Sequence, residues 1–180
     1  MIAAQKKIRV APQNLHMQCG ASLLEGIAYL GIAAIVILGA VSLLTGAFSS
    51  AQSNQAGEET TAIRTAVRKL YLGQGYGTVS LNDTLQKAHA FPGTLVPSGA
   101  AGAVKNVWGG DVVVTGIGDG TFTIAYPNVP QDVCINTLVS ASGWQQVVIG
   151  SKNETVFPVP PATAATDCVV GTNTMTFHSL

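Results

Sequence analysis

The pattern of apolar and polar positions divides the chain into three stretches of different character. The first twenty residues are mixed, and residues 26–57 contain no charged side chain. Within this uncharged stretch, residues 27–48 are almost continuously apolar, which is enough for one membrane-spanning helix of about 20 residues. Glycines, Ser42 and Thr45 make this run only moderately hydrophobic. Beyond residue 57, charges return and apolar positions become periodic.

The periodicity predicts one long helix over residues 22–72. No proline occurs within residues 13–91, so nothing breaks the helix there. Its first half is apolar all round, whereas its second half carries one apolar stripe at i, i+4, i+7 and i+8, formed by Ile63, Val67, Leu70 and Tyr71. Three closely spaced glycines, Gly73, Gly75 and Gly77, end it. The polar residues 49–57 between the halves either continue the helix or form a flexible linker.

The remainder of the chain is dominated by strand signals. Runs 111–115 and 121–126 are rich in β-branched and aromatic residues and flank the hairpin loop 116–120. Weaker runs cover residues 145–149 and 174–177. A long helix followed by an antiparallel sheet of about four strands is an α+β fold. A short second helix is expected near residue 83, capped by Ser80 or Asn82.

Charge is distributed unevenly, although the formal net charge is zero. The first twenty residues hold Lys6, Lys7 and Arg9 and no acid, whereas the rest of the chain carries a net charge of −3. Basic residues before an apolar helix mark the cytoplasmic side of a membrane, so the C-terminal region is expected outside, in the periplasm of a Gram-negative host. No basic patch indicates nucleic-acid binding.

Glu25 stands out because it lies at the edge of the apolar run. A carboxylate in a membrane-spanning stretch costs roughly 2.5 kcal/mol or more at the helix centre, which makes it a candidate functional residue. A cut after Gly20 would leave the apolar helix on the mature chain and give Ala21 a new positive amine. A neighbouring copy could then offer that amine to Glu25. The alternative is an uncleaved N-terminal anchor.

The three cysteines differ in their surroundings. Cys19 lies in the basic leader, whereas Cys134 and Cys168 lie in the exported region, where disulfides persist. A disulfide between these two cysteines would close a loop of about 35 residues and contribute roughly 4 kcal/mol in the chain-entropy model. Two thiols without neighbouring histidines do not fill a tetrahedral zinc shell, so no metal is expected.

The chain carries no recognisable catalytic constellation. The sequence lacks the motifs of zinc proteases, α/β-hydrolases, P-loop enzymes and dinucleotide-binding folds. The histidines are scattered: His16 lies in the leader, and His89 and His178 are expected to be surface or packing residues. We therefore expect neither an enzyme nor a cofactor.

Taken together, these residues resemble a type IV pilin of the type IVb class. The similarity rests on Gly20-Ala21-Ser22-Leu23-Leu24-Glu25 with the apolar helix, on Asn106-Val107-Trp108-Gly109-Gly110 before the sheet, and on the Cys134 and Cys168 pair. The leader is longer than in type IVa pilins, and Ala21 replaces their usual first phenylalanine. The similarity is looser downstream of the helix.

The resemblance implies a structural protein that polymerises with itself. It implies a leader (residues 1–20) that a prepilin peptidase removes after Gly20, with methylation of Ala21. It also implies a membrane and filament-core half-helix (21–50) and an exported globular domain (51–180). The implied partners are an assembly ATPase, an inner-membrane platform and a secretin, and the precursor would wait in the inner membrane before entering an extracellular pilus.

The implied filament would serve adhesion, aggregation or conjugative mating contact. Three alternatives remain at this point: a minor pilin or tip adhesin, a pseudopilin of a type II secretion system, and a membrane-anchored enzyme.

Overall fold

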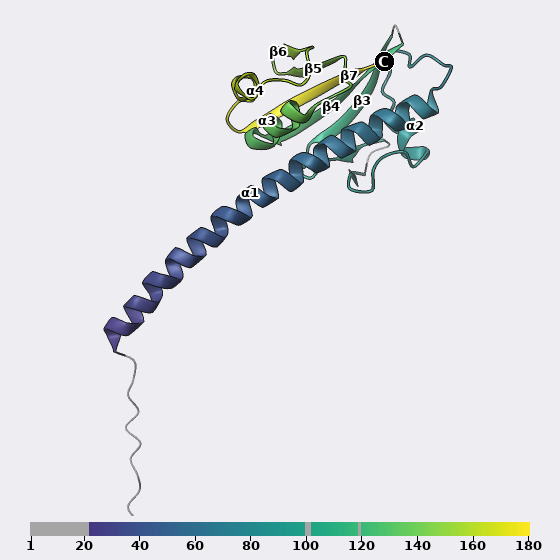
Figure 1. The fold of residues 1–180 in the computed structure, drawn as a ribbon. Helices are drawn as coiled ribbons and strands as arrows, with labels where there is room; N and C mark the ends of the chain where they lie inside the picture. The colour runs from purple at the N-terminus through teal and green to yellow at the C-terminus, as the bar shows by residue number, and fades with distance from the viewer. Residues whose placement is uncertain (1–21, 100–101, 119) are drawn as a thin grey trace, which may run out of the picture. The chain divides into compact units, whose positions relative to one another are not determined.

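The computed structural model describes residues 22–99, 102–118 and 120–180. These residues form four helices and seven strands (Figure 1). The helices are α1 (Leu23–Leu70), α2 (Asn82–Lys87), α3 (Gln131–Ser140) and α4 (Pro161–Asp167). The strands are β1 (Val96–Pro97), β2 (Val104–Lys105), β3 (Asp111–Gly118), β4 (Thr121–Pro130), β5 (Gln146–Ile149), β6 (Lys152–Glu154) and β7 (Thr172–Ser179).

The predicted long helix is present and continuous. Helix α1 has 48 residues, so the polar stretch 49–57 is helical and the linker alternative is wrong. The chain divides into two compact units at Ser42/Leu43, within this helix. The first unit contributes the N-terminal part of α1, and the second contains the rest of α1 and the sheet.

The seven strands of the second unit form one antiparallel sheet. Its strand order is β1-β2-β3-β4-β7-β5-β6, with the longest strands in the centre (Figure 1). The predicted hairpin is β3–β4, in which Val114 lies opposite Ile124. The sheet has seven strands rather than the expected four. The sequence did not predict β1, β2 and β6 because they are only two or three residues long. Strands that short carry no alternating pattern.

One face of the sheet and the later half of α1 enclose the core. On β4, Phe122, Ile124 and Tyr126 are fully buried, as their alternation predicts. On α1, Ile63 and Val67 are buried in the same cluster, whereas Leu70 lies at the exposed end of the stripe. Burying such side chains is the main stabilising contribution, at roughly 1.5–3 kcal/mol each.

The expected cap of α2 is wrong. The N-cap position is Leu81, and no side chain caps the helix. Asn82 is instead the first helical residue, and its buried amide bonds three backbone groups, one at Gly102 and two on β3. Its Nδ2 donates to the carbonyls of Gly102 and Val112 at 2.9 and 2.8 Å, while its Oδ1 accepts from Val114 N at 2.7 Å. Tertiary hydrogen bonds therefore use the amide that a local cap would have needed.

Candidate assembly segment and disulfide-closed region

Helix α1 begins with a side-chain cap. Ser22 precedes the first helical residue, and its Oγ accepts a hydrogen bond from Glu25 N at 3.2 Å. The order Ser22-Leu23-Leu24-Glu25 matches the capping-box pattern, in which a serine at the N-cap precedes a glutamate three residues later. The sequence therefore contains a signal for the start of the helix at Ser22 and Glu25, in addition to the charge of Glu25.

Glu25 is exposed in the first turn of α1, where the helix dipole favours a negative charge. The Tyr29 hydroxyl, one turn later, donates to Glu25 Oε1 at 3.4 Å. Two ion pairs join described residues, Lys87–Asp83 and Lys105–Asp111, and Glu25 takes part in neither. Its carboxylate is therefore accessible to a cation from outside the described chain.

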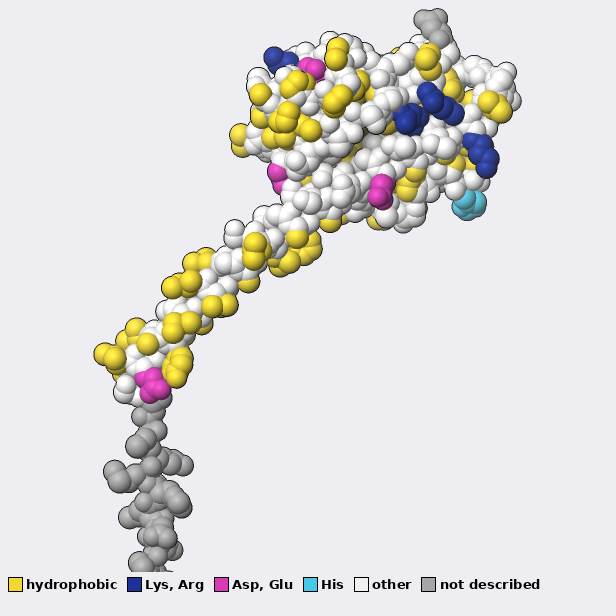
Figure 2. Space-filling model, in the orientation of Figure 1, with side chains coloured by type: hydrophobic (Ala, Val, Ile, Leu, Met, Phe, Trp, Pro, Cys, Tyr) yellow, Lys and Arg dark blue, Asp and Glu magenta, His cyan; other side chains and the backbone are white. Residues whose placement is uncertain are grey.

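The residues that follow Glu25 form a bare apolar surface. Between Ile27 and Phe48, large aliphatic side chains are mostly more than half exposed, and they cover this part of α1 (Figure 2). An 18-residue window of the helix has a mean hydropathy of 2.5 and contains no buried residue. By length and composition, this segment can cross a membrane.

The expected cleavage and methylation positions, Gly20 and Ala21, lie outside the described residues, as do Cys19 and His16. The other two predicted site residues, Cys134 and Cys168, are joined in a disulfide with a Cα–Cα distance of 6.0 Å. This bond connects α3 to the residue that follows α4.

Hydrogen bonds fasten the residues that follow α4 to α3 and to β7. Gln131 Nε2 donates to the Cys168 carbonyl at 2.9 Å. The buried Asn173 accepts from Val169 N at 2.8 Å and donates to the Val169 carbonyl at 3.0 Å. Val169 and Val170 remain 60% and 87% exposed between these anchors. Val169 and Val170 therefore form an exposed apolar turn next to the disulfide.

A buried acidic contact, which the sequence did not reveal, joins α1 to the sheet. Glu59 is 2% exposed, and its carboxylate accepts hydrogen bonds from the Tyr126 hydroxyl and from Gln55 Nε2, the latter at 2.7 Å. Burial, followed by this hydrogen bond and the negative charge, raises the pKa of Tyr126. A glutamate on a helix usually indicates a solvated position, so only the tertiary structure shows this role.

The titratable groups of the described residues form no metal-binding cluster. Within the described residues, no three His, Cys, Asp or Glu side chains lie close enough to hold a metal. His178 is on β7, where burial lowers its pKa, and His89 follows α2 on the surface. The two histidines therefore belong to separate parts of the fold.

Comparison with known proteins identifies the family. A family model described as PilS N terminal matches residues 50–180, which is most of the chain. A crystal structure of a type IVb pilin from Salmonella typhi has 30% sequence identity and a TM-score of 0.54, covering 67% of this chain and 97% of that chain. None of the curated proteins compared with the chain matches it. The long helix followed by an antiparallel sheet agrees with these matches, and the chain therefore belongs to the PilS family of type IVb pilins, the structural subunits of type IV pili.

Proposed function

We propose that the chain is the precursor of a type IVb pilus subunit, cleaved after Gly20 and assembled through α1. The observation that carries this proposal is the exposed Glu25, which lies just before the uncharged, uncovered part of α1. Methylation of the Ala21 amine after cleavage would retain its positive charge. The proposed partners are a prepilin peptidase, an assembly ATPase, an inner-membrane platform and a secretin.

Pairing between Glu25 and the Ala21 amine of another copy would fix the axial register of the subunits. An unpaired carboxylate inside a dry helix bundle costs several kcal/mol, whereas a paired one tolerates burial. Because donor and acceptor lie on different copies, each subunit can contact one neighbour through each group. A contact of this head-to-tail kind produces an open helix when the rotation between neighbours does not close into a ring.

The assembly role of Glu25 is tested by Glu25→Ala. We expect normal export and cleavage but at least tenfold fewer surface filaments by electron microscopy. Tyr29→Phe is the matched control, because it removes the hydroxyl that contacts Glu25 and leaves the carboxylate. Ser22→Ala separates the cap from the charge and is expected to retain filaments. Abundant filaments from Glu25→Ala would reject the pairing.

The cleavage site is tested by substitutions at Gly20. Gly20→Val is expected to accumulate uncut precursor, whereas Gly20→Ala is expected to be tolerated better. The measurement is the intact mass of the membrane-associated chain. An unchanged mature mass after Gly20→Val would place the cut elsewhere.

The membrane orientation of the precursor follows from its basic leader. We propose that Lys6, Lys7 and Arg9 stay in the cytoplasm and that the globular domain waits in the periplasm. Protease added to spheroplasts should then degrade the domain. Protection of the domain in intact spheroplasts, with digestion after lysis, would reverse this orientation.

The abundance of the chain in filaments separates a major subunit from other members of the family. We propose the major subunit of a filament that serves adhesion, aggregation or mating contact. Sheared surface material should contain an abundant protein whose first residue is Ala21. A trace component at filament tips would indicate a minor pilin or adhesin, and retention in the envelope would indicate a pseudopilin.

A further inference from the structure

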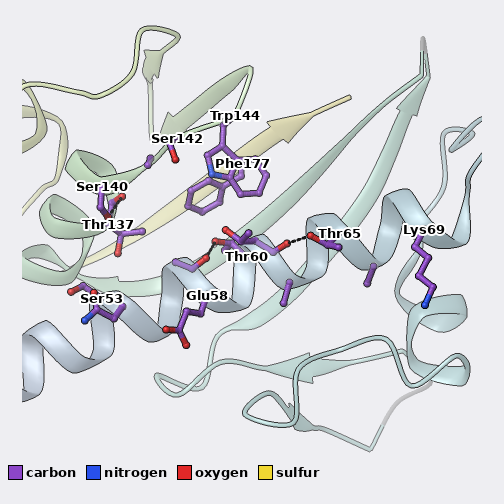
Figure 3. Close-up of a pocket in the computed structure, with 16 residues that line it drawn as sticks. Ser53, Glu58, Thr60, Thr65, Lys69, Thr137, Ser140, Ser142, Trp144 and Phe177 are labelled. Atoms are coloured by element: carbon purple, nitrogen blue, oxygen red, sulfur yellow. Dashed lines mark hydrogen bonds between the residues drawn. The ribbon is translucent and has the colours of Figure 1, made fainter.

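A groove runs along the second unit beside the later half of α1. Its volume is about 730 Å³, and the facing wall is built from α3 and its connection to β5 (Figure 3). On α1 its lining includes Gly57, Thr61, Ala62 and Thr65. Trp144 and Phe177 also line it, with ring centroids 4.9 Å apart. The groove thus combines small side chains on the helix with aromatic rings beside them.

Arg64 lies next to the aromatic ring of Trp144 but is not among the residues that line the groove. Arg64 donates to the Gly143 carbonyl at 2.6 Å and lies over the Trp144 ring, 4.4 Å from its centroid. Burial, and then the charge of Arg68, lowers the pKa of Arg64. Glu58 and Lys69 line the groove too, but both extend away from the aromatic rings (Figure 3). An uncharged occupant therefore fits better than an ionic one.

A buried hydroxyl on the facing wall has unused hydrogen-bonding capacity. Thr137 lines the groove and is 3% exposed, and its Oγ1 has no hydrogen-bond partner among the described residues. A buried polar group without a partner costs roughly 1–3 kcal/mol. An occupant that brings a hydroxyl or a backbone group to Thr137 would remove this cost.

The same chain contains a segment with matching chemistry. Residues 26–48 are uncharged and exposed apart from partial cover at Gly26, and a subunit that leaves the membrane must have them covered by protein. Gly39, Ser42 and Gly46 lie on one helical face, at i, i+3 and i+7. Small residues on two facing helices let their backbones approach closely. Ser42 would also carry a hydroxyl into the groove.

The lengths of groove and segment also agree. The lining residues on α1 extend from Ser53 to Lys69, which is about 24 Å of helix at 1.5 Å per residue. Residues 26–48 form a helical stretch of about 33 Å by the same rise. The segment can therefore fill the whole groove and still extend beyond it.

We propose that the groove receives the apolar segment of a second copy, with Gly39, Ser42 and Gly46 of one subunit facing Gly57, Thr61 and Thr65 of the next. This inference rests on the proposed function, because only a self-polymerising chain brings the two surfaces together. It adds the place on the neighbouring subunit where the apolar helix is covered.

Cysteine cross-linking in assembled filaments tests the contact directly. The full chain with Ser42→Cys and Thr61→Cys, two substitutions of similar size, is produced in cells that also make the unaltered chain. Mild oxidation should give a ladder of multimers, because each subunit links to two neighbours. Mass spectrometry should map the linkage to positions 42 and 61.

The control pair is Ser42→Cys with Thr84→Cys, since Thr84 is exposed on α2 outside the groove. This pair should give no ladder. Normal filaments without a ladder from Thr61→Cys, tested against cysteines at positions 39, 42 and 46, would overturn the docking proposal alone. A ladder of equal strength from Thr84→Cys would overturn it as well. Absence of filaments from the unaltered chain would instead reject the proposed function.

Filling the groove gives a second, independent readout. Ala62→Trp places a large ring at an exposed lining position and should reduce filament number at least tenfold. Ala165→Trp, at an exposed position on α4, is the matched control and should leave filaments unchanged. Equal filament numbers from the two variants would contradict occupation of the groove.

Discussion

Glu59 is a buried carboxylate whose two donors come from different parts of the fold. Gln55 lies one turn earlier on α1, whereas Tyr126 comes from β4 in the centre of the sheet. The contact therefore holds the helix to the sheet at a defined position. Removing one donor leaves the Glu59 carboxylate buried with one hydrogen-bond donor instead of two. This loss costs more free energy than the hydrogen bond itself contributes.

Tyr126→Phe isolates this effect, because the ring and its edge-to-face contact with Trp108 remain. We expect the free energy of unfolding to fall by about 1–3 kcal/mol. Urea denaturation of the full chain in mild detergent, followed by tryptophan fluorescence, measures it. Tyr76→Phe, at a half-exposed ring that packs on Phe122, should change stability by less than about 0.5 kcal/mol. Equal losses of unfolding free energy from Tyr126→Phe and Tyr76→Phe would contradict a stabilising hydrogen bond between Tyr126 and Glu59.

A second acidic contact makes stability depend on pH. Glu154 on β6 meets Asp167 at the end of α4, where Asp167 is 6% exposed and its Oδ2 has no hydrogen-bond partner among the described residues. Burial, then the hydrogen bond and charge of Asp167, raises the pKa of Glu154, while Lys152 opposes the shift. Because the pKa of Glu154 is raised in the folded state, the contribution of Glu154 to stability is present at acid pH and is lost as pH rises through that folded-state pKa.

Asp167→Asn should therefore stabilise the domain at neutral pH, because an amide N–H can donate to the Glu154 carboxylate without a second negative charge. The expected result is a higher melting temperature than the unaltered chain at pH 7.5 and a smaller difference near pH 4.5. The pKa of His178 is lowered in the folded state, so the contribution of His178 to the stability of the domain is lost as pH falls. It is present in both proteins and cancels in the comparison. A difference independent of pH would contradict the repulsion between the two carboxylates.

At the scale of elements, the edge of β3 depends on a close backbone approach. Gly116 N donates to the Val79 carbonyl at 3.0 Å, and Gly118 N donates to the Gly77 carbonyl at 3.0 Å. A Cβ added to Gly116 would overlap the Tyr76 carbonyl oxygen and would lie 2.6 Å from that of Gly77. The chain that follows α1 can pair with the strand only because this position has no side chain.

Gly116→Ala is expected to destabilise the domain by about 1–3 kcal/mol through this overlap. Faster amide exchange at Gly118 would localise the damage to the β3 edge. Gly75→Ala is the matched control, because a Cβ there meets no atom within 4 Å and the position is exposed. Its expected effect is within about 0.5 kcal/mol. Similar losses from both substitutions would rule out the steric explanation.

Elements encoded by local patterns could be predicted, whereas tertiary hydrogen bonds could not. The apolar run and the glycines after Tyr71 specify α1 locally, and the alternation of β4 specifies its buried face. Asn82 looked like a cap, because its sequence position gives no sign of three distant backbone partners. The groove escaped prediction for the same reason: Thr61 and Thr137 become neighbours of one cavity only after the chain has folded.

At the scale of the whole molecule, one segment has to be compatible with two environments. In the membrane, residues 26–48 need only be apolar, and lipid accepts large and small side chains alike. In the proposed filament, the same residues would pack against protein, where shape matters as well as hydrophobicity. A substitution that changes shape while remaining apolar can therefore separate anchoring from assembly.

Gly39→Leu is such a substitution. A Cβ at Gly39 meets no atom within 4 Å in the single chain, so the isolated subunit should fold normally. Leucine also favours membrane insertion by a few tenths of a kcal/mol, and it is a better helix former than glycine. Membrane fractions should consequently contain as much mature protein as those of the unaltered chain, while surface filaments fall at least tenfold.

Leu38→Met is the control, because it retains a large apolar side chain at the adjacent, exposed position and should leave filaments intact. Fractionation measures anchoring, and electron microscopy of the same cells measures assembly. Loss of the protein from the membrane would assign the defect to insertion instead. The added side chain meets no atom of its own subunit, so any clash must come from a neighbouring subunit. Normal filaments from Gly39→Leu would therefore show that no neighbour lies close to this face of the helix.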